Sequence, residues 1–284
     1  MIGTVGDLVE DIVVRFAGPV HEASDTGAIV AHRRGGSAAN MAVSVARAGH
    51  PARFIGQVGD DDQGLALIES LRRDGVDAVV RRGGRTGTIV VLVDLEGERT
   101  MLTDRGACTA LDRPEAGWLD GLQSLHIPVY SLVGEPLAST TGTLIDWAHA
   151  RGITVSIDAS SASVIEDFGA ESLLSLISEL RPSVLFCNEL EAEVLGPGID
   201  PLLIGAEATI IKRGARSALL LQPDVESIEV PALALRDVRD TTGAGDAFAA
   251  GFLIARASGG ALVDAVVTAH SCAAHAIAST SEHT

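Results

Sequence analysis

Short apolar runs alternate with segments of helical periodicity along most of the chain. Ile153–Ile157 and Ser183–Cys187 are continuous apolar runs, typical of strands buried on both faces of a parallel sheet. Residues 208–211 and 218–222 form a further pair of predicted strands. Helical patterns cover residues 37–48, 62–73, 136–150, 243–257 and 261–279. The alternation predicts an α/β domain with a largely parallel sheet.

Two stretches break this rhythm. Residues 8–34 contain alternating segments around a Gly-Pro turn, and residues 86–103 read as a hairpin turning at Glu96-Gly97. Four such strands would form a small sheet that is only marginally stable by itself. It must therefore pack against something, either as a lid over an active site or against a partner subunit. We therefore expect residues 1–7, 35–83 and 106–284 to form the α/β domain. Residues 8–34 and 84–105 are then a β lid, and a homodimer through the lid is one arrangement that would cover it.

Composition narrows the range of partners. The 284 residues include 38 acidic and 21 basic side chains, a net charge of −17, which argues against a nucleic-acid partner but not against a small anionic ligand. No apolar run reaches the roughly 18–20 residues of a membrane span, and the N-terminus lacks signal-peptide features. Three cysteines without a CxxC pair suggest reduced thiols. We expect a cytoplasmic protein without a membrane partner.

The strongest chemical signal is the segment DTTGAGDAF at residues 240–248, which opens an Ala-rich helix. Gly243, Ala244 and Gly245 allow backbone N–H groups to converge on an anion at the helix N-terminus. Asp246 lies at the same place, where a carboxylate is costly unless it acts on a proton. A base beside an anion hole fits phosphoryl transfer to a hydroxyl. The alternative is a Gly-rich turn with an acidic residue facing the helix dipole.

A second signal is GGSAAN at residues 35–40. Gly35 and Gly36 allow a ligand to approach the backbone closely, and Asn40 lies on the first turn of the following helix. The alternative is simple capping by Ser37. The segment is not GxGxxG, so a dinucleotide site is not expected, and the chain contains no P-loop, HExxH or GxSxG motif.

These motifs, in this order, are similar to those of the PfkB (ribokinase-like) family of carbohydrate and nucleoside kinases. The resemblance covers essentially the whole chain. It rests on residues 6–11 (GDLVED), 35–42 (GGSAANMA), 56–61 (GQVGDD), 188–191 (NELE), 212–214 (KRG) and 240–248 (DTTGAGDAF). It implies a ribokinase-like three-layer α/β/α domain with a small β-sheet lid, and an ATP-dependent carbohydrate kinase that uses Mg²⁺.

The resemblance also implies residue roles. Asp246 would be the general base, and the turn from Gly243 to Gly245 the anion hole for the transferred phosphate. The sugar hydroxyls would be held by Asp11, Gly35, Gly36 and Asn40. Asn188 and Glu191 would organise Mg²⁺, largely through water, and Lys212, Gly214, Ser217 and His270 would line the nucleotide. For His270 the alternative is a surface helix histidine.

Two features qualify these roles. Lys212 is the single lysine among 21 basic residues, and a compact ammonium suits nucleotide phosphates, although chance is the alternative. Asp240 and Thr242 match half of a monovalent-cation site. The segment that would supply the other half is altered after residue 279, which places K⁺ activation in question.

The composition of the lid indicates the class of substrate. Its segments contain one aromatic residue, Phe16, whereas nucleoside binding needs apolar surface for stacking. A small sugar or sugar acid is therefore favoured, with a nucleoside kinase or a non-catalytic sugar-binding protein as alternatives. Arg105 could pair a substrate carboxylate or phosphate, or instead form a surface salt bridge to Asp104 or Asp112. Glu135 is a further candidate for a sugar hydroxyl.

Overall fold

The computed structural model describes the chain except residues 236–237, 239–240 and 282–284. The helices are α1 (Ser37–Arg47), α2 (Asp62–Arg73), α3 (Leu137–Ala150), α4 (Ala162–Phe168), α5 (Ala170–Leu180), α6 (Glu189–Leu195), α7 (Pro201–Ile204), α8 (Ala244–Ala257) and α9 (Leu262–Ser281). The strands are β1 (Ile2–Val5), β2 (Val9–Phe16), β3 (Ala28–Gly35), β4 (Ala52–Val58), β5 (Asp77–Arg82), β6 (Thr88–Val93), β7 (Arg99–Asp104), β8 (Ser124–Pro128), β9 (Thr154–Asp158), β10 (Val184–Asn188), β11 (Ala208–Lys212), β12 (Ala218–Gln222) and β13 (Val225–Val230). No helix among the described residues is both long and apolar enough to span a bilayer.

Nine of these strands form the large sheet, in the order β13-β12-β11-β10-β9-β8-β1-β4-β5. The strands from β11 to β5 pair in parallel, and β12 and β13 add an antiparallel edge. The predicted α/β domain with a largely parallel sheet is confirmed. In a parallel sheet the carboxyl ends of all strands meet at one edge, which is where ligands bind in such folds.

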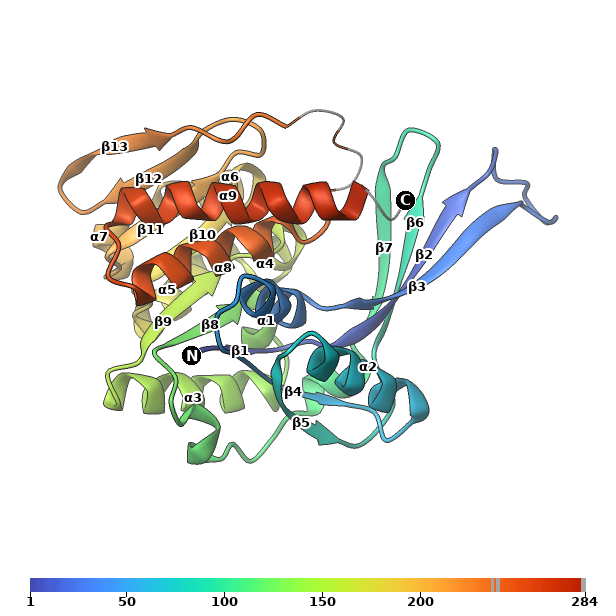
Figure 1. Ribbon diagram of the computed structural model, residues 1–284, viewed down its shortest axis with the longest axis horizontal. Coiled ribbons are helices and arrows are strands. Elements are labelled where there is room, and N and C mark those ends of the chain that lie inside the picture. Colours follow the sequence, from blue (N-terminus) through green and yellow to red (C-terminus); the bar gives the residue numbers. More distant parts are fainter. Residues whose placement is uncertain (236–237, 239–240, 282–284) are drawn as a thin grey trace.

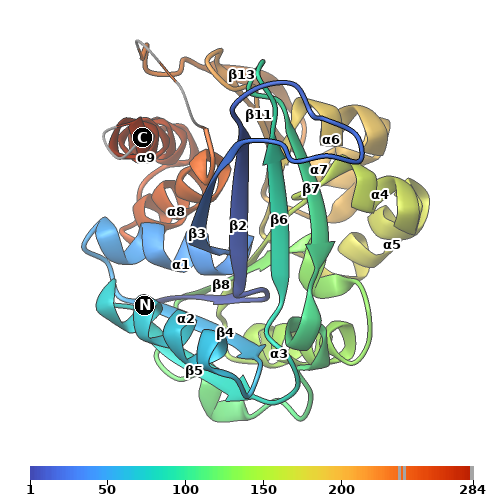
Figure 2. The same ribbon diagram turned by 90° about the vertical axis from the view of Figure 1, so that its right-hand side faces the viewer.

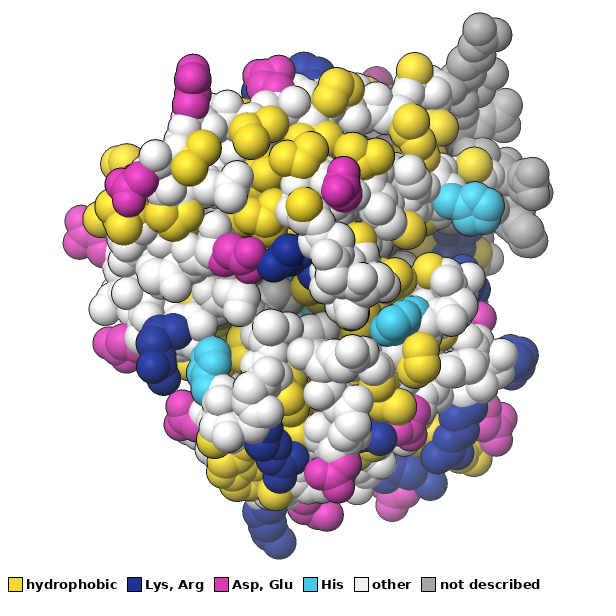
Figure 3. Space-filling model, turned by 60° about the vertical axis from the view of Figure 1, so that its left-hand side comes forward, with side chains coloured by type: hydrophobic (Ala, Val, Ile, Leu, Met, Phe, Trp, Pro, Cys, Tyr) yellow, Lys and Arg dark blue, Asp and Glu magenta, His cyan; other side chains and the backbone are white. Residues whose placement is uncertain are grey.

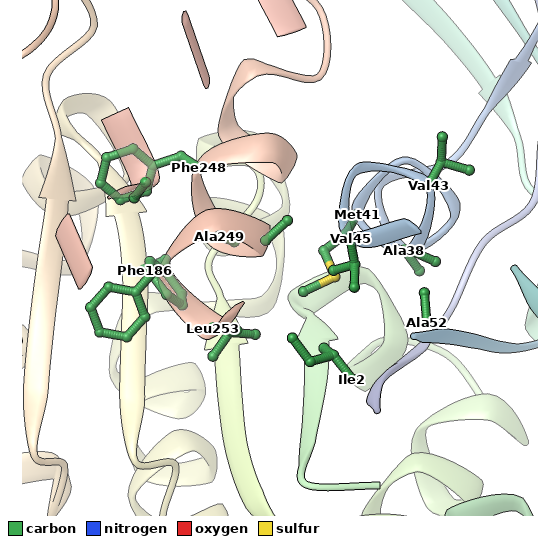
Figure 4. Packing of buried hydrophobic residues seen from close by; sticks show 14 of the residues in the cluster. Ile2, Ala38, Met41, Val43, Val45, Ala52, Phe186, Phe248, Ala249 and Leu253 are labelled. Carbon is green, nitrogen blue, oxygen red and sulfur yellow. The ribbon is translucent and has the colours of Figure 1, made fainter. Parts of the chain in front are cut away.

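Helices cover both faces of the large sheet (Figures 1 and 2). One buried cluster joins the sheet to α1, α2, α8 and α9, and a second joins it to α3 and the helices up to α7. In the first cluster, Phe186 of β10 packs edge-on against Phe248 and Phe252 of α8, with ring centroids 6.5 and 5.3 Å apart. Figure 4 shows Met41 and Val45 of α1 across from Ala249 and Leu253. This packing fixes the first turns of α1 and α8 relative to each other.

The remaining four strands form a separate sheet in the order β3-β2-β6-β7, which stands off the main domain (Figures 1 and 2). Strands β2 and β3 form one antiparallel pair and β6 and β7 another, and β2 joins the two pairs by running parallel to β6. We call this sheet the lid. The strand patterns predicted for residues 8–34 and 86–103 are present, although β3 continues through Gly35.

Two polar clusters hold the lid where it leaves the main domain. Asp61 caps α2 by accepting from Gly64 N at 2.8 Å and also accepts from Thr86 N at 2.8 Å. Asp61, the middle residue of an acidic run at residues 60–62, is thus the structural cap of α2. On the other connection, Arg105 donates to both carboxylate oxygens of Asp7, at 2.7 and 2.8 Å.

Candidate active site

A cleft of about 1400 Å³ lies between the lid and the carboxyl ends of the central strands. Its walls come from β2, β3, β6 and β7 on the lid side and from α1, α2, β9, β10, β11, α8 and α9 on the domain side. The sequence-predicted residues that line it are Asp11, Gly36, Asn40, Arg105, Asn188, Glu191, Lys212, Gly214, Thr242, Gly243, Ala244, Gly245 and Asp246. Residues more than 200 positions apart therefore meet in one cleft.

Asp246 lies on the first turn of α8, directly after the turn formed by Gly243 to Gly245. Its Oδ1 accepts a hydrogen bond from Ser37 Oγ at 2.7 Å. Burial and the negative charge of Asp158 raise the pKa of Asp246 to about 7, against the opposing effects of Ser37, Lys212 and Asn40. A carboxylate with such a pKa can accept a proton near neutral pH and release it again.

Lys212, at the end of β11, lies beside the same turn. Its Nζ is 2.6 Å from Asp158 Oδ2, and a Cβ atom built on Gly245 would lie only 3.4 Å from Nζ. Burial alone lowers the pKa of Lys212, but the neighbouring carboxylates Asp158, Glu191 and Asp246 raise it overall. The lysine is therefore a fixed positive charge next to the backbone that would receive an anion.

Asn188 and Glu191 form a reciprocal cap at the start of α6. Asn188 Oδ1 accepts from Glu191 N at 2.9 Å, and Glu191 Oε2 accepts from Asn188 N at 2.7 Å. Burial and Asp158 raise the pKa of Glu191 to about 7. Mg²⁺ usually keeps several waters and takes one or two carboxylates together with substrate phosphates. Two carboxylates that line the cleft, Glu191 and Asp158, fit that requirement.

Asp11, on β2, faces the cleft from the lid. Its Oδ1 is buried and has no hydrogen-bond partner among the described residues, and burial raises its pKa to about 6. A Cβ atom on Gly35 would lie 2.0 Å from this oxygen, and one on Gly36 would lie 2.1 Å from Asp7 O. Gly36 also has φ 101°. Both glycines are thus required where β3 turns into α1 beside Asp11.

Several predicted site residues are not among the described residues that line the cleft. His270 is buried, with Nε2 3.1 Å from Val230 O and its ring against Phe248. Its neighbours on α9 that line the cleft are Ser271, Cys272, His275 and Ala276. Glu135 is exposed and accepts from Ser139 N, and Ser217 Oγ donates to Glu229.

Arg105 does line the cleft, but its guanidinium is engaged by other groups. Besides the paired bonds to Asp7, it donates to Tyr130 O at 2.8 Å and Val133 O at 3.2 Å. Its partner is therefore neither Asp104, which pairs with Arg85, nor Asp112. Whether Arg105 also contacts substrate stays a prediction.

Thr242 Oγ1 accepts a hydrogen bond from Arg99 of the lid. A guanidinium at this oxygen competes with the monovalent cation predicted there. The other predicted ligand of that cation, Asp240, lies outside the described residues. Arg99 thus connects the start of β7 to the turn that begins α8.

Two residues of the site were not found from the sequence. Asp158 is the last residue of β9. Its position could have identified it, because ligands bind at the carboxyl ends of parallel strands and a carboxylate follows the apolar run there. Ser37 was considered only as a helix cap, in the alternative to ligand binding by residues 35–40, whereas α1 has no side-chain cap and Ser37 donates to Asp246 instead. Its role depends on the contact between α1 and α8, which sequence spacing does not show.

The sequence also resembles those of known proteins. The model of the pfkB family of carbohydrate kinases matches residues 4–284. The chain belongs to this family. The predicted resemblance is confirmed, and the family is one of ATP-dependent kinases.

Among curated relatives, the bifunctional protein HldE of Pseudomonas syringae pv. tomato is 32% identical over 247 residues, which is 84% of this chain and 50% of the relative. HldE of Pseudomonas fluorescens is 33% identical over 245 residues, 82% of this chain and 49% of the relative. The chain therefore spans about half the length of these relatives.

Solved structures show the same fold. Adenosine kinase from Sinorhizobium meliloti has a TM-score of 0.86 at 24% identity, covering 98% of this chain and 93% of that one. A probable sugar kinase from Rhizobium etli has a TM-score of 0.85 at 25% identity, covering 97% and 92%. An Escherichia coli protein described as a ribokinase II, in complex with ATP and Mg²⁺, has a TM-score of 0.83 at 23% identity, covering 97% and 92%. Nucleoside and sugar kinases both resemble the chain, so the fold does not choose between these substrates.

Proposed function

We propose that the protein transfers the γ-phosphoryl group of ATP to a hydroxyl of a small sugar or sugar acid, with Asp246 as the general base. The observation that carries this is the position of Asp246. Its carboxylate, with a pKa near 7, adjoins the turn from Gly243 to Gly245 at the N-terminus of α8. In this role Asp246 accepts the hydroxyl proton as the new O–P bond forms and the bond to ADP breaks.

The neighbouring residues support the same reaction. N–H groups of the turn would stabilise charge on the transferred phosphoryl group, and Lys212 adds a positive charge beside them. Mg²⁺ bound with ATP would be held near Glu191 and Asp158 and would neutralise charge on its phosphates. Asp11, Asn40 and Gly36 would hold the sugar hydroxyls, with the lid closing over them. The unpartnered oxygen of Asp11 supports this assignment because a buried acceptor without a donor is costly unless a ligand supplies one.

Asp246→Asn tests the assignment. The amide keeps the size of the side chain but cannot accept the proton, so kcat should fall by at least 10²-fold while ATP still binds. Phosphorylation is measured with a panel of sugars, sugar acids and nucleosides. Retention of more than about a tenth of wild-type kcat would remove Asp246 from the role of base. Turnover of adenosine in preference to every sugar would favour the nucleoside kinase, and ligand binding without turnover would favour the non-catalytic sugar-binding protein.

We also propose a homodimer through the outer face of the lid. Alternation along the strands places Val14, Val30, Leu92 and Leu102 on the face away from the cleft. Val30 is 54% exposed and Leu102 56% exposed, and exposed apolar side chains that gather on one face often mark a protein interface. Leu102→Glu should convert a dimer to a monomer in light scattering. A monomeric wild-type protein would contradict the proposal.

A further inference from the structure

A second cavity, of about 230 Å³, lies at the edge of the large sheet opposite to the cleft. It is lined by the amino ends of β8, β9 and β10, by the residue before β11 and by the last turns of α8. These elements end on the left of Figure 1, on the side that Figure 3 turns toward the viewer. None of the sequence-predicted site residues belongs to its described lining. The proposed phosphoryl transfer therefore does not account for this cavity.

The two walls of the cavity differ in chemistry. The sheet supplies side-chain hydroxyls at its amino edge, from Ser124 of β8 and from Thr154 and Ser156 of β9. The helix α8 supplies the apolar side chains of Phe252 and Leu253. A few polar groups on an otherwise apolar lining are typical of sites that orient a small molecule. A ligand that fits has hydrogen-bonding groups on one side and apolar surface on the other.

Ser124 has an unused hydroxyl in this wall. Its side chain is buried, and its Oγ has no hydrogen-bond partner among the described residues. The neighbouring hydroxyls are bonded, because Ser156 Oγ lies 2.9 Å from His126 Nδ1 and Thr154 Oγ1 donates to Gln123 O at 3.1 Å. A buried hydroxyl without a partner is costly. The position of Ser124 therefore indicates that a polar group of a ligand enters the cavity.

The charged groups of the cavity neutralise each other. Arg256 donates to both carboxylate oxygens of Glu207, at 2.7 and 3.0 Å, and to Gly260 O at 2.8 Å. Arg256 and Glu207 are the only charged side chains in the described lining. Acidic and basic side chains are also interspersed on the face shown in Figure 3. The cavity therefore offers no excess of charge to an ionic ligand.

The volume of the cavity limits the size of the ligand. A protein cavity of about 150 Å³ holds one benzene molecule, so about 230 Å³ has room for a six-membered ring with substituents. Hydroxyl substituents suit the wall formed by the sheet, because a hydroxyl can donate as well as accept a hydrogen bond.

We infer that this cavity is a second ligand site, which binds a small uncharged cyclic polyol through a hydrogen bond to Ser124. The ring lies against Phe252 and Leu253, and its hydroxyls face the amino ends of β8 and β9. The inference does not rest on the proposed function, because the described linings of the cavity and the cleft share no residue.

Methyl NMR with myo-inositol as the probe distinguishes the cavity from the cleft. Val184 and Leu253 line the cavity, whereas Val91 and Met101 line the cleft. We expect myo-inositol to shift the methyl signals of Val184 and Leu253, also when the cleft is saturated with Mg²⁺ and a non-hydrolysable ATP analogue. Shifts confined to Val91 and Met101, or no shifts at all, would overturn the inference.

Two variants test the contacts in the cavity. Ser124→Ala should weaken the binding of myo-inositol about 2- to 10-fold, the loss of one neutral hydrogen bond. Ala257→Phe places a ring at the partly exposed end of α8 and should block the cavity without changing the core. Ser258→Phe is the matched control, because Ser258 is exposed and does not belong to the described lining. Unchanged affinity in either cavity variant, or an equal loss in Ser258→Phe, would overturn the inference.

Matched ring compounds test the class of ligand. Cyclohexanol, with one hydroxyl, should bind about tenfold more weakly than myo-inositol because several hydrogen bonds are lost. Cyclohexanecarboxylate should bind at least as weakly as cyclohexanol, since its charge would be buried without a counter-charge. If either compound shifted the signals of Val184 and Leu253 with an affinity equal to that of myo-inositol, the assignment of an uncharged polyol would be wrong.

Discussion

Lys212 Nζ lies 2.6 Å from Asp158 Oδ2, and the side chains are only 14% and 8% exposed. Both charges act on Asp246, because Asp158 raises its pKa and Lys212 lowers it. The ion pair therefore sets the pH range in which the proposed base is ionised. Replacing Asp158 and replacing Lys212 should therefore move the pH range in which Asp246 is ionised in opposite directions.

Asp158→Asn removes a negative charge near Asp246, so the pKa of Asp246 should fall below about 7 and the acidic limb of the pH–rate profile should move to lower pH. Lys212→Met removes a positive charge and should move the limb to higher pH. The measurement is kcat/KM from pH 5 to 9 for both variants. Shifts in the same direction would show that the limb does not report Asp246.

Asp246→Asn should stabilise the empty protein at alkaline pH. The pKa of Asp246 is raised from 3.8 to about 7 in the folded protein. The preference of the folded state for the protonated side chain therefore contributes fully to stability only below the pKa of the unfolded state. That contribution is lost as pH rises through about 7. The asparagine variant avoids this loss and should gain about 1–3 kcal/mol at pH 8 and little at pH 4. Urea unfolding at both values measures the difference, and a gain independent of pH would contradict the linkage.

Arg105→Met should destabilise the fold, because it leaves Asp7 buried without its cation. Removing one partner of a buried pair costs about 3–5 kcal/mol. Asp7→Asn combined with Arg105→Met should recover part of this loss, since no buried charge then remains unpaired. Thermal unfolding of the single and double variants measures the effect. An unchanged melting temperature with weakened acceptor binding would instead favour direct substrate recognition by Arg105.

Asp11→Ala should weaken sugar binding by about 1.5–3 kcal/mol for each hydrogen bond lost to the carboxylate. ATP binding should change little, because Asn188 and Lys212 lie on the other wall of the cleft. Titrating the variant with each ligand separately distinguishes the two effects. Equal losses for sugar and ATP would mean that Asp11 supports the fold.

The elements were predictable where local pattern determines structure. Residues 37–48 and 62–73 were expected as helices and form α1 and α2 within one residue, because apolar periodicity and caps are encoded locally. The strands of the lid were also predicted, through alternation and the turn at Glu96-Gly97. The DTTGAGD segment placed Asp246 beside a backbone turn because the helix start and the glycines are adjacent in sequence.

Tertiary partners were not predictable in this way. Arg105 was expected to meet a substrate or a nearby aspartate, but it meets Asp7, 98 residues away. His270 was expected at the nucleotide, but the rotation of α9 turns it toward Val230 and Phe248. Each outcome depends on how a side chain is directed after the elements pack, and sequence spacing does not contain that information.

The parallel pairing of β2 with β6 has a consequence for how the protein forms. The two hairpins of the lid are separated along the chain by α1, β4, α2 and β5, so their pairing requires this intervening segment to bring its ends together. Contacts of such long sequence separation form late because loop closure must precede them. The lid is therefore not an autonomous module. Neither hairpin contains the complete sheet. A single hairpin moved to another scaffold would lack the central pairing of β2 with β6, because that pairing depends on the part of the main domain that lies between the two hairpins.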